Sequence, residues 1–330
     1  MKFVKRKLGI GIGVGLLSAA ALALRIGARR AARQPIPDAI SPAIFSSRVA
    51  QTAQGEMIYH TSGAGQPLVF FHGFFLGASS YEWSKVYSHF VEDYEVIAPD
   101  LIGFGESERP SRTMSADDYV DCLAEFLRET TGNRPATLVA SGLSAGFSLR
   151  LASLHPDLVA RLVLWLPTNL KESSTWHSFG FRSLSALPGL SRFIYRNHLA
   201  SDSFIRTWLS DEAFADPARL TDEIVTILTT CAQQYGAEHA VLGLLRGRLA
   251  FDLLSGLSAI ATPTFILWPQ KAPLPPNIDS VLKAIPNSTL EVLPETGVLA
   301  ALENPKLVTQ TLARILQNSS SAAHDKARLG

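Results

Sequence analysis

The chain has 330 residues, of which 47% are hydrophobic and 18% charged, with 23 glycines and 19 prolines. This composition excludes a disordered chain, a collagen and a coiled coil, and the length allows a large buried core. The net charge of +1 hides an asymmetry, because eight of the 30 Lys and Arg lie in residues 1–34 and no acid does. The remainder has 22 basic against 29 acidic residues, so we expect no nucleic-acid partner.

Residues 1–34 are predicted to be a membrane anchor or a signal segment. An uncharged run at residues 8–24 has four basic residues on each side. As a helix it spans roughly 26 Å, close to a hydrocarbon core of ~30 Å. The pattern favours an uncleaved anchor, while cleavage near Ala21-Leu22-Ala23 or a helix lying on the membrane surface are alternatives. We therefore expect the protein to be membrane-associated, or exported if the segment is cleaved, with an orientation that the charges leave open.

The body alternates short apolar strands with helices after a linker at residues 35–37. The predicted strands are residues 56–61, 67–71, 94–99, 136–140, 161–166, 264–268 and 289–293. Several are continuous apolar runs, which are typical of strands covered on both faces. The alternation predicts an α/β fold with a doubly wound, mostly parallel sheet.

Helix boundaries can be read from capping residues. Ser115 and Asp118 have the spacing of a capping box, and Gly132 is predicted to end that helix. A later helix is predicted to begin at Pro305 and another at Asp216-Pro217. From about residue 169 to 250 helical periodicity and aromatic residues dominate, which predicts a helical cap. The core is accordingly divided into residues 35–168 and 251–318, with a disordered tail at 319–330.

A Gly-x-Ser-x-Gly motif occupies Gly142-Leu143-Ser144-Ala145-Gly146, between a predicted strand and a predicted helix. A catalytic serine in this setting sits on a strained turn, which small neighbours make possible, and faces the amides that begin the helix. The motif predicts Ser144 as a nucleophile with Gly142 and Gly146 shaping the turn. The alternative interpretation is an ordinary turn serine.

Together these residues resemble the α/β-hydrolase superfamily, in the capped branch that includes esterases and lipase-like enzymes. The resemblance covers residues 50–317 and implies an oxyanion hole formed by the amides of Phe74 and Ala145. His72 and Gly73 belong to the loop of that hole by the same resemblance. The other matching segments are Asp100-Leu101-Ile102-Gly103-Phe104-Gly105-Glu106-Ser107, Leu267-Trp268 and Glu303-Asn304-Pro305.

Two positions depart from the pattern of the family. Ala272 stands where the resemblance implies the aspartate of a catalytic triad, and Val298 stands where it implies the histidine. Residues 166–169, the other place for the acid, contain no carboxylate. Neither Ala272 nor Val298 can accept a proton, so the sequence predicts a degenerate triad.

Substitutes for the missing base are few. His72, His177 and His198 are candidates, although each is more often a packed or solvated histidine. Glu295 lies near the vacant histidine position but is a weak base for a serine hydroxyl. Asp100 is expected to hold its loop rather than to act as a nucleophile.

Two functions follow from this pattern. One is a membrane-associated serine hydrolase that acts on an ester or other acyl compound through Ser144. The other is a non-catalytic relative, a pseudoenzyme, that binds a small apolar ligand or a protein partner. A lyase or transferase that uses only the oxyanion hole is a third interpretation. The cysteines, Cys122 and Cys231, lack metal-ligand spacing, and the chain has neither a phosphate loop nor a dinucleotide motif, so we expect no cofactor and no metal.

Overall fold

The computed structural model describes residues 41–169, 188–275 and 278–328. The predicted membrane segment at residues 8–24 lies outside them, as does His177. Among the helices of the described ranges, none combines the length and the hydropathy needed to cross a membrane.

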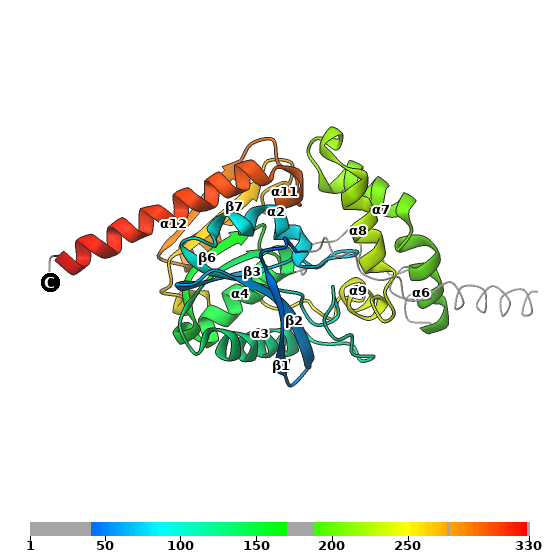
Figure 1. The fold of residues 1–330 in the computed structure, drawn as a ribbon, viewed down its shortest axis with the longest axis horizontal. Coiled ribbons are helices and arrows are strands. Elements are labelled where there is room, and N and C mark those ends of the chain that lie inside the picture. The colour runs from blue at the N-terminus through cyan, green and yellow to red at the C-terminus, as the bar shows by residue number, and fades with distance from the viewer. Residues whose placement is uncertain (1–40, 170–187, 276–277, 329–330) are drawn as a thin grey trace, which may run out of the picture.

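A single eight-stranded sheet, in the order β1-β2-β4-β3-β5-β6-β7-β8, forms the centre of the molecule (Figure 1). The pairs β1–β2 and β2–β4 are antiparallel and the other neighbours are parallel, which confirms the predicted mostly parallel sheet. The strands are β1 Ser46–Thr52, β2 Gly55–Ser62, β3 Gln66–Phe71, β4 Tyr94–Pro99, β5 Ala136–Ser141, β6 Val159–Trp165, β7 Thr264–Pro269 and β8 Ser288–Leu293.

The seven predicted strands correspond to β2–β8, and β1 is the strand that the sequence analysis missed. Only Ala50 is buried in β1, because this edge strand presents the rest of its side chains to solvent or leaves them half-buried. It therefore has no apolar face that a sequence pattern would reveal.

Helices cover both faces of the sheet (Figure 1). The α-helices are α2 Ser84–Tyr87, α3 Ala116–Thr131, α4 Gly142–Leu154, α6 Pro188–Ile194, α7 Asp202–Trp208, α8 Asp222–Ala232, α9 Glu238–Leu245, α10 Ile278–Ala284, α11 Ala300–Glu303 and α12 Pro305–Arg328. The shorter helical segments are η2 Ser80–Trp83, η3 Ser88–Phe90, η4 Pro156–Leu158, η5 Tyr195–Leu199, η6 Leu209–Ala213, η7 Pro217–Arg219 and η8 Leu257–Ala259.

Strand β3 shows how the two faces form. Its side chains alternate between faces, as strand geometry requires. Phe70 packs in the cluster that includes α2 and α12 and contacts Tyr87 at 5.9 Å between ring centroids. Phe71 packs on the opposite face and contacts Phe126 of α3 at 6.4 Å. A continuous apolar run is therefore what a strand buried on both faces needs.

Most of the predicted helix boundaries agree with the structure. The Ser115–Asp118 capping box is formed and Gly132 ends α3 in the left-handed region, with φ 62°. The expected helix at Asp216-Pro217 is wrong, because only the short η7 forms there and α8 begins at Asp222, with Thr221 as its N-cap.

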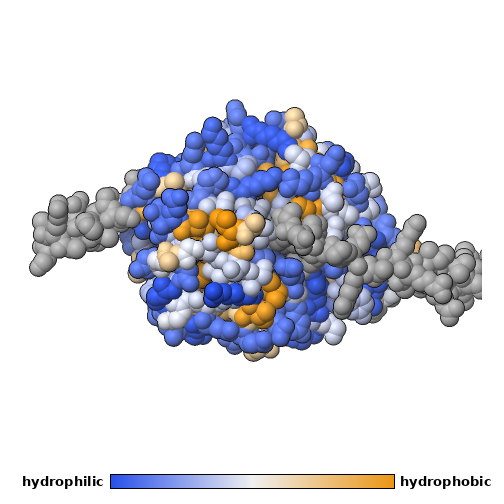
Figure 2. All heavy atoms as spheres, in the orientation of Figure 1, coloured by the Kyte–Doolittle hydropathy of each residue, from blue (hydrophilic) through white to orange (hydrophobic). Residues whose placement is uncertain are grey.

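Two further features concern the ends and the surface of the molecule. Helix α12 continues to Arg328, past residue 319 where the sequence predicts a tail, and its end extends away from the body in Figure 1. The face seen in Figure 2 is mostly hydrophilic, with hydrophobic atoms gathered in small separate areas. Helices α6–α9 lie together on one side of the sheet.

Candidate active site and ligand pocket

A cavity of about 360 Å³ lies between helices α7 and α9 and the carboxyl ends of several strands. Apart from Ser141, Thr168 and the indole of Trp208, the side chains that line it are apolar or belong to glycines. The ring of Phe75, after β3, stacks on Trp208 of α7 at 6.0 Å between centroids, which ties the cap to the sheet edge. The remaining lining residues are Gly73, Phe74, Leu76, Gly142, Leu143, Leu166, Leu199, Phe204, Val241, Leu244, Leu245, Val298 and Leu299.

The turn between β5 and α4 is made by Gly142. Strand β5 ends at Ser141 and α4 begins at Gly142, whose φ of 57° is in the left-handed region. A nucleophile elbow places its reactive residue on this sharp strand-to-helix turn. A Cβ atom at Gly142 would meet nothing within 4 Å, so a side chain here would project into open space beside the cavity. The residue in the nucleophile position is therefore a glycine.

Ser144 is not on the turn, and its predicted display as a nucleophile is wrong. It lies in the first turn of α4, is 0% exposed and does not line the cavity. Its Oγ donates a hydrogen bond of 2.5 Å to the carbonyl oxygen of His72. The Gly-x-Ser-x-Gly motif misplaced the elbow by two residues, because Gly142 adopts a positive φ more readily than a serine. Gly146 instead allows close packing, since a Cβ there would lie 2.2 Å from the Thr168 carbonyl oxygen.

Because the turn is made by Gly142 and not by Ser144, one of the two predicted oxyanion donors is replaced. In a helix that begins at Gly142, the amide of Ala145 bonds back to the carbonyl of Ser141 and is not available to a ligand. The amide of Leu143 precedes the first intrahelical bond, and Leu143 lines the cavity together with Phe74. An oxyanion hole uses the residue after the nucleophile position and one from the loop after β3. The two donor positions are therefore Leu143 and Phe74.

His72 has a structural environment. Its Nε2 accepts a hydrogen bond from the amide of Leu101 at 2.9 Å, and its Nδ1 lies 2.8 Å from the carbonyl oxygen of Gly73. Burial lowers the pKa of His72, although the nearby charge of Asp100 and the Gly73 carbonyl oppose this effect. The ring is thus neutral, with both nitrogens bonded to the backbone, and it is not placed to take a proton from a serine.

The other two triad positions also lack functional groups. Val298 lines the cavity, while Ala272 is half-buried and its carbonyl accepts a hydrogen bond from Trp268 Nε1 at 3.0 Å. Glu303 holds the loop before Val298, because its Oε2 accepts from the amide of Gly297 at 2.7 Å. The backbone thus keeps the geometry of the loop without the histidine.

Neither of the other predicted bases in the described part of the chain, Glu295 and His198, lines this cavity. Glu295 is 79% exposed at its side chain and faces Arg219 at 3.6 Å, so it behaves as a turn residue. His198 is exposed and contacts Phe204 edge-on at 5.0 Å. Asp100 holds its loop as expected, since its carboxylate accepts hydrogen bonds from the amides of Ser80 and Glu106.

Sequence reasoning missed a polar pair below the cavity, Glu82 and Ser141. Glu82 is 2% exposed and accepts a hydrogen bond of 2.6 Å from the amide of Gly73. Burial raises the pKa of Glu82 to about 7, against the lowering effects of the Gly73 amide and the Ser141 hydroxyl. Ser141 lines the cavity, while its hydroxyl is buried and forms no hydrogen bond of normal geometry with the described residues. No sequence pattern relates positions 82 and 141, which the fold alone brings together.

Comparison with known proteins agrees with this fold. Residues 66–203 match the family model described as alpha/beta hydrolase fold. The chain is 39% identical over 107 residues to the 2-hydroxymuconate semialdehyde hydrolase of Pseudomonas sp. (strain CF600), which covers 32% of this chain and 38% of that relative. It is 26% identical over 280 residues to an uncharacterized hydrolase of Bacillus subtilis (strain 168), covering 81% of this chain and 96% of the relative.

A solved structure shows the same fold over most of the chain. A meta-cleavage product hydrolase (CumD) from Pseudomonas fluorescens IP01 superposes with a TM-score of 0.68 and 21% identity, covering 82% of this chain and 98% of that one. The elbow, the cap and the parallel sheet define an α/β-hydrolase fold. The chain therefore has the α/β-hydrolase fold, and both relatives are named as hydrolases.

Proposed function

We propose that this chain binds a small apolar ligand with an acyl oxygen in the cavity under the cap, and that it does not catalyse serine-type hydrolysis. The observation that carries the proposal is Gly142 on the elbow, with Val298 and Ala272 at the other two triad positions. Loss of the nucleophile or the base of a serine triad costs about 10⁶ in kcat, and the oxyanion hole alone keeps roughly 10³–10⁴ over water. The simultaneous loss of the nucleophile, the histidine and the aspartate favours ligand binding without catalysis.

The lining of the cavity supports the chemical class of the ligand. Its volume of about 360 Å³ is in the range of small-molecule sites, and almost all of its side chains are apolar. The donor positions at its base are the amides of Phe74 and Leu143. A carbonyl or carboxylate oxygen fits these donors, and its hydrocarbon part fits the cap.

A ligand titration with matched variants tests the binding proposal. The probe is a fluorescently labelled medium-chain fatty acid, followed by fluorescence anisotropy. Leu244→Trp fills the cavity and is expected to weaken binding at least about tenfold, as overpacking of a site costs about 1–3 kcal/mol. Leu190→Trp is the control, because Leu190 is an exposed cap leucine outside the cavity lining. Equal affinity of both variants, or no binding by the wild-type protein, would refute the proposal.

A slow acyl transfer at Ser141 is the second candidate function. The observation that favours it is the hydroxyl of Ser141 beside Glu82, a buried carboxyl whose pKa of about 7 suits a general base at neutral pH. Labelling by a fluorophosphonate that Ser141→Ala abolishes and Ser144→Ala preserves would establish this candidate over the non-catalytic one.

Association with a membrane through residues 8–24 is a separate proposal. Its support is the uncharged run flanked on each side by four basic residues. The full chain is expected to sediment with membranes and to stay there after a high-salt wash, whereas a variant that lacks residues 1–34 is expected to be released. Release of the full chain by salt would argue against an apolar anchor.

A further inference from the structure

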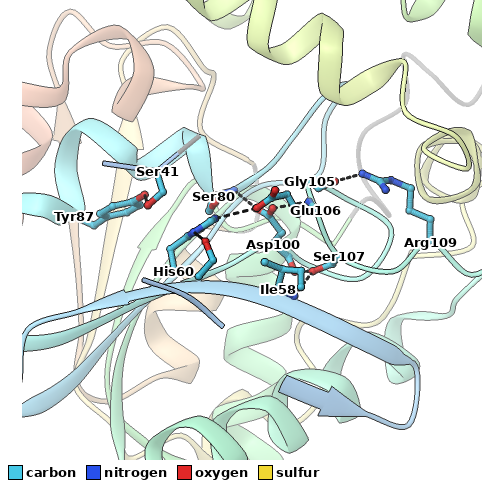
Figure 3. A network of polar contacts seen from close by, with 11 residues as sticks. Ser41, Ile58, His60, Ser80, Tyr87, Asp100, Gly105, Glu106, Ser107 and Arg109 are labelled. Carbon is cyan, nitrogen blue, oxygen red and sulfur yellow. Dashed lines mark hydrogen bonds and ion pairs between the residues drawn. The ribbon is translucent and has the colours of Figure 1, made fainter. Parts of the chain in front are cut away.

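A cluster of three side chains lies at the loop that follows β4 (Figure 3). His60 is on β2, Asp100 follows β4, and Glu106 is in the loop after it. One potential ligand atom from each lies within 4.8 Å of the other two. The antiparallel register that pairs His60 with Ala98 brings the imidazole beside the residues that end β4. Two segments distant in sequence, β2 and the loop after β4, thus direct one nitrogen and two carboxylates to one place.

The imidazole nitrogen that faces this cluster is the second observation. His60 is 3% exposed, and its Nδ1 lies 3.0 Å from Ser47 Oγ, which fixes the ring. Among the described residues its buried Nε2 has no hydrogen-bond partner, and it faces Glu106 Oε2 at 3.8 Å. In the tautomer whose Nδ1–H donates to Ser47, the lone pair of Nε2 points toward the two carboxylates. The three groups can then ligate one cation between them.

Asp100 is held in place independently of any ligand. Its Oδ1 accepts from the amide of Ser80 at 2.6 Å and its Oδ2 from the amide of Glu106 at 2.7 Å. A carboxylate has about four acceptor sites, so two remain for a cation. Arg109 adds positive charge nearby, but its guanidinium donates to the carbonyl oxygen of Gly105, as Figure 3 shows.

We propose that His60, Asp100 and Glu106 form a binding site for a divalent transition-metal ion, with Zn²⁺ as the best match. One imidazole and two carboxylates are a donor set that Zn²⁺ accepts, and two carboxylates balance its charge. With metal–ligand bonds of about 2.1 Å, ligand atoms are about 3.4 Å apart at tetrahedral positions. The 3.8 Å between Nε2 and Oε2 is close to that spacing. Glu106 is 40% exposed at its side chain and gives the ion a path from solvent.

Such an ion has a structural consequence for the pocket. It joins β2 to the loop of residues 100–107, and Asp100 in turn holds the amide of Ser80, in the segment after Phe74 and Phe75. The ion therefore fixes the loop that forms one wall of the cavity. This role does not depend on any catalytic activity or on the ligand of the cavity.

Calorimetric titration with Zn²⁺ tests the site, using chelator-treated protein without a histidine tag. We expect one ion per chain and a higher midpoint of thermal unfolding when the ion is present. His60→Ala and Glu106→Gln are expected to weaken affinity at least about tenfold, and Ser47→Ala about tenfold, as loss of an orienting contact does. Glu106 is partly exposed, so its variant preserves the fold.

Two controls separate the site from adventitious binding. His155→Ala removes a half-buried histidine that contacts Arg128, and Glu92→Gln removes an exposed acid. Both are expected to bind Zn²⁺ like the wild-type protein. Absence of binding by the wild-type protein, or equal loss in the control variants, would overturn the assignment and indicate that a proton alone occupies the space beside Nε2.

Discussion

Restoring the triad on this backbone requires a change at Gly142, not at Ser144. The double variant Ala272→Asp/Val298→His supplies an acid and a base, but the Ser144 hydroxyl is buried in α4 and bonded to the His72 carbonyl. We therefore expect the double variant to remain inactive. Adding Gly142→Ser places a hydroxyl on the turn, where the space is open.

The magnitudes follow from the structure. A side chain at φ 57° costs about 1–3 kcal/mol of stability, without a steric term because no atom lies within 4 Å of the new Cβ. The esterase activity of the triple variant is expected to exceed that of the double variant at least about 100-fold. This factor is small beside the rate enhancement of about 10⁶ that a complete triad supplies. Hydrolysis of p-nitrophenyl esters of several chain lengths measures the esterase activity. A folded but inactive triple variant, or an active double variant, would refute the placement of the elbow.

Three further predictions concern single side chains in and around the site. Burial raises the pKa of Glu82 from 4.5 to about 7, so the folded state binds this proton more tightly than the unfolded state. The free energy of unfolding is therefore expected to fall by about 3 kcal/mol as the pH rises from about 4.5 to 7. Glu82→Gln should remove that slope in urea titrations at several pH values, and an unchanged slope would contradict the assignment. Ser144→Ala should lower stability by about 1–3 kcal/mol, because the His72 carbonyl loses its donor, yet leave probe affinity unchanged; weaker binding would place Ser144 in the site. Trp208→Ala should weaken probe binding roughly fivefold, as loss of an aromatic contact of about 1 kcal/mol implies, and unchanged anisotropy curves would exclude Trp208 from the pocket.

The fold was largely predictable from the sequence, because buried strands and capped helices have local patterns. The apolar run of β3 and the Ser115 cap of α3 each follow from residues that are adjacent in the chain. Strand β1 was not predictable, since its pairing with β2, rather than an apolar face of its own, stabilises it.

The sequence correctly placed the site at the carboxyl ends of the parallel strands, but it assigned the nucleophile position to the wrong residue. Ser144 completes a Gly-x-Ser-x-Gly motif at residues 142–146. That motif does not indicate which residue adopts the left-handed backbone conformation, and in the structure this residue is Gly142. The observation available in the sequence was that Gly142 directly follows an apolar strand and tolerates that conformation best. The pairing of Glu82 with Ser141, and of His60 with Asp100, depends on strand order and register, which no local pattern contains.

The central claim is that the elbow of this α/β-hydrolase fold has no reactive hydroxyl. Intact-mass measurement of the wild-type protein after incubation with a fluorophosphonate, followed by peptide mapping, tests it most directly, with the triple variant as the positive control. The account predicts an unmodified wild-type chain and a single adduct at position 142 of the triple variant. An adduct on wild-type Ser144 or Ser141 would contradict it.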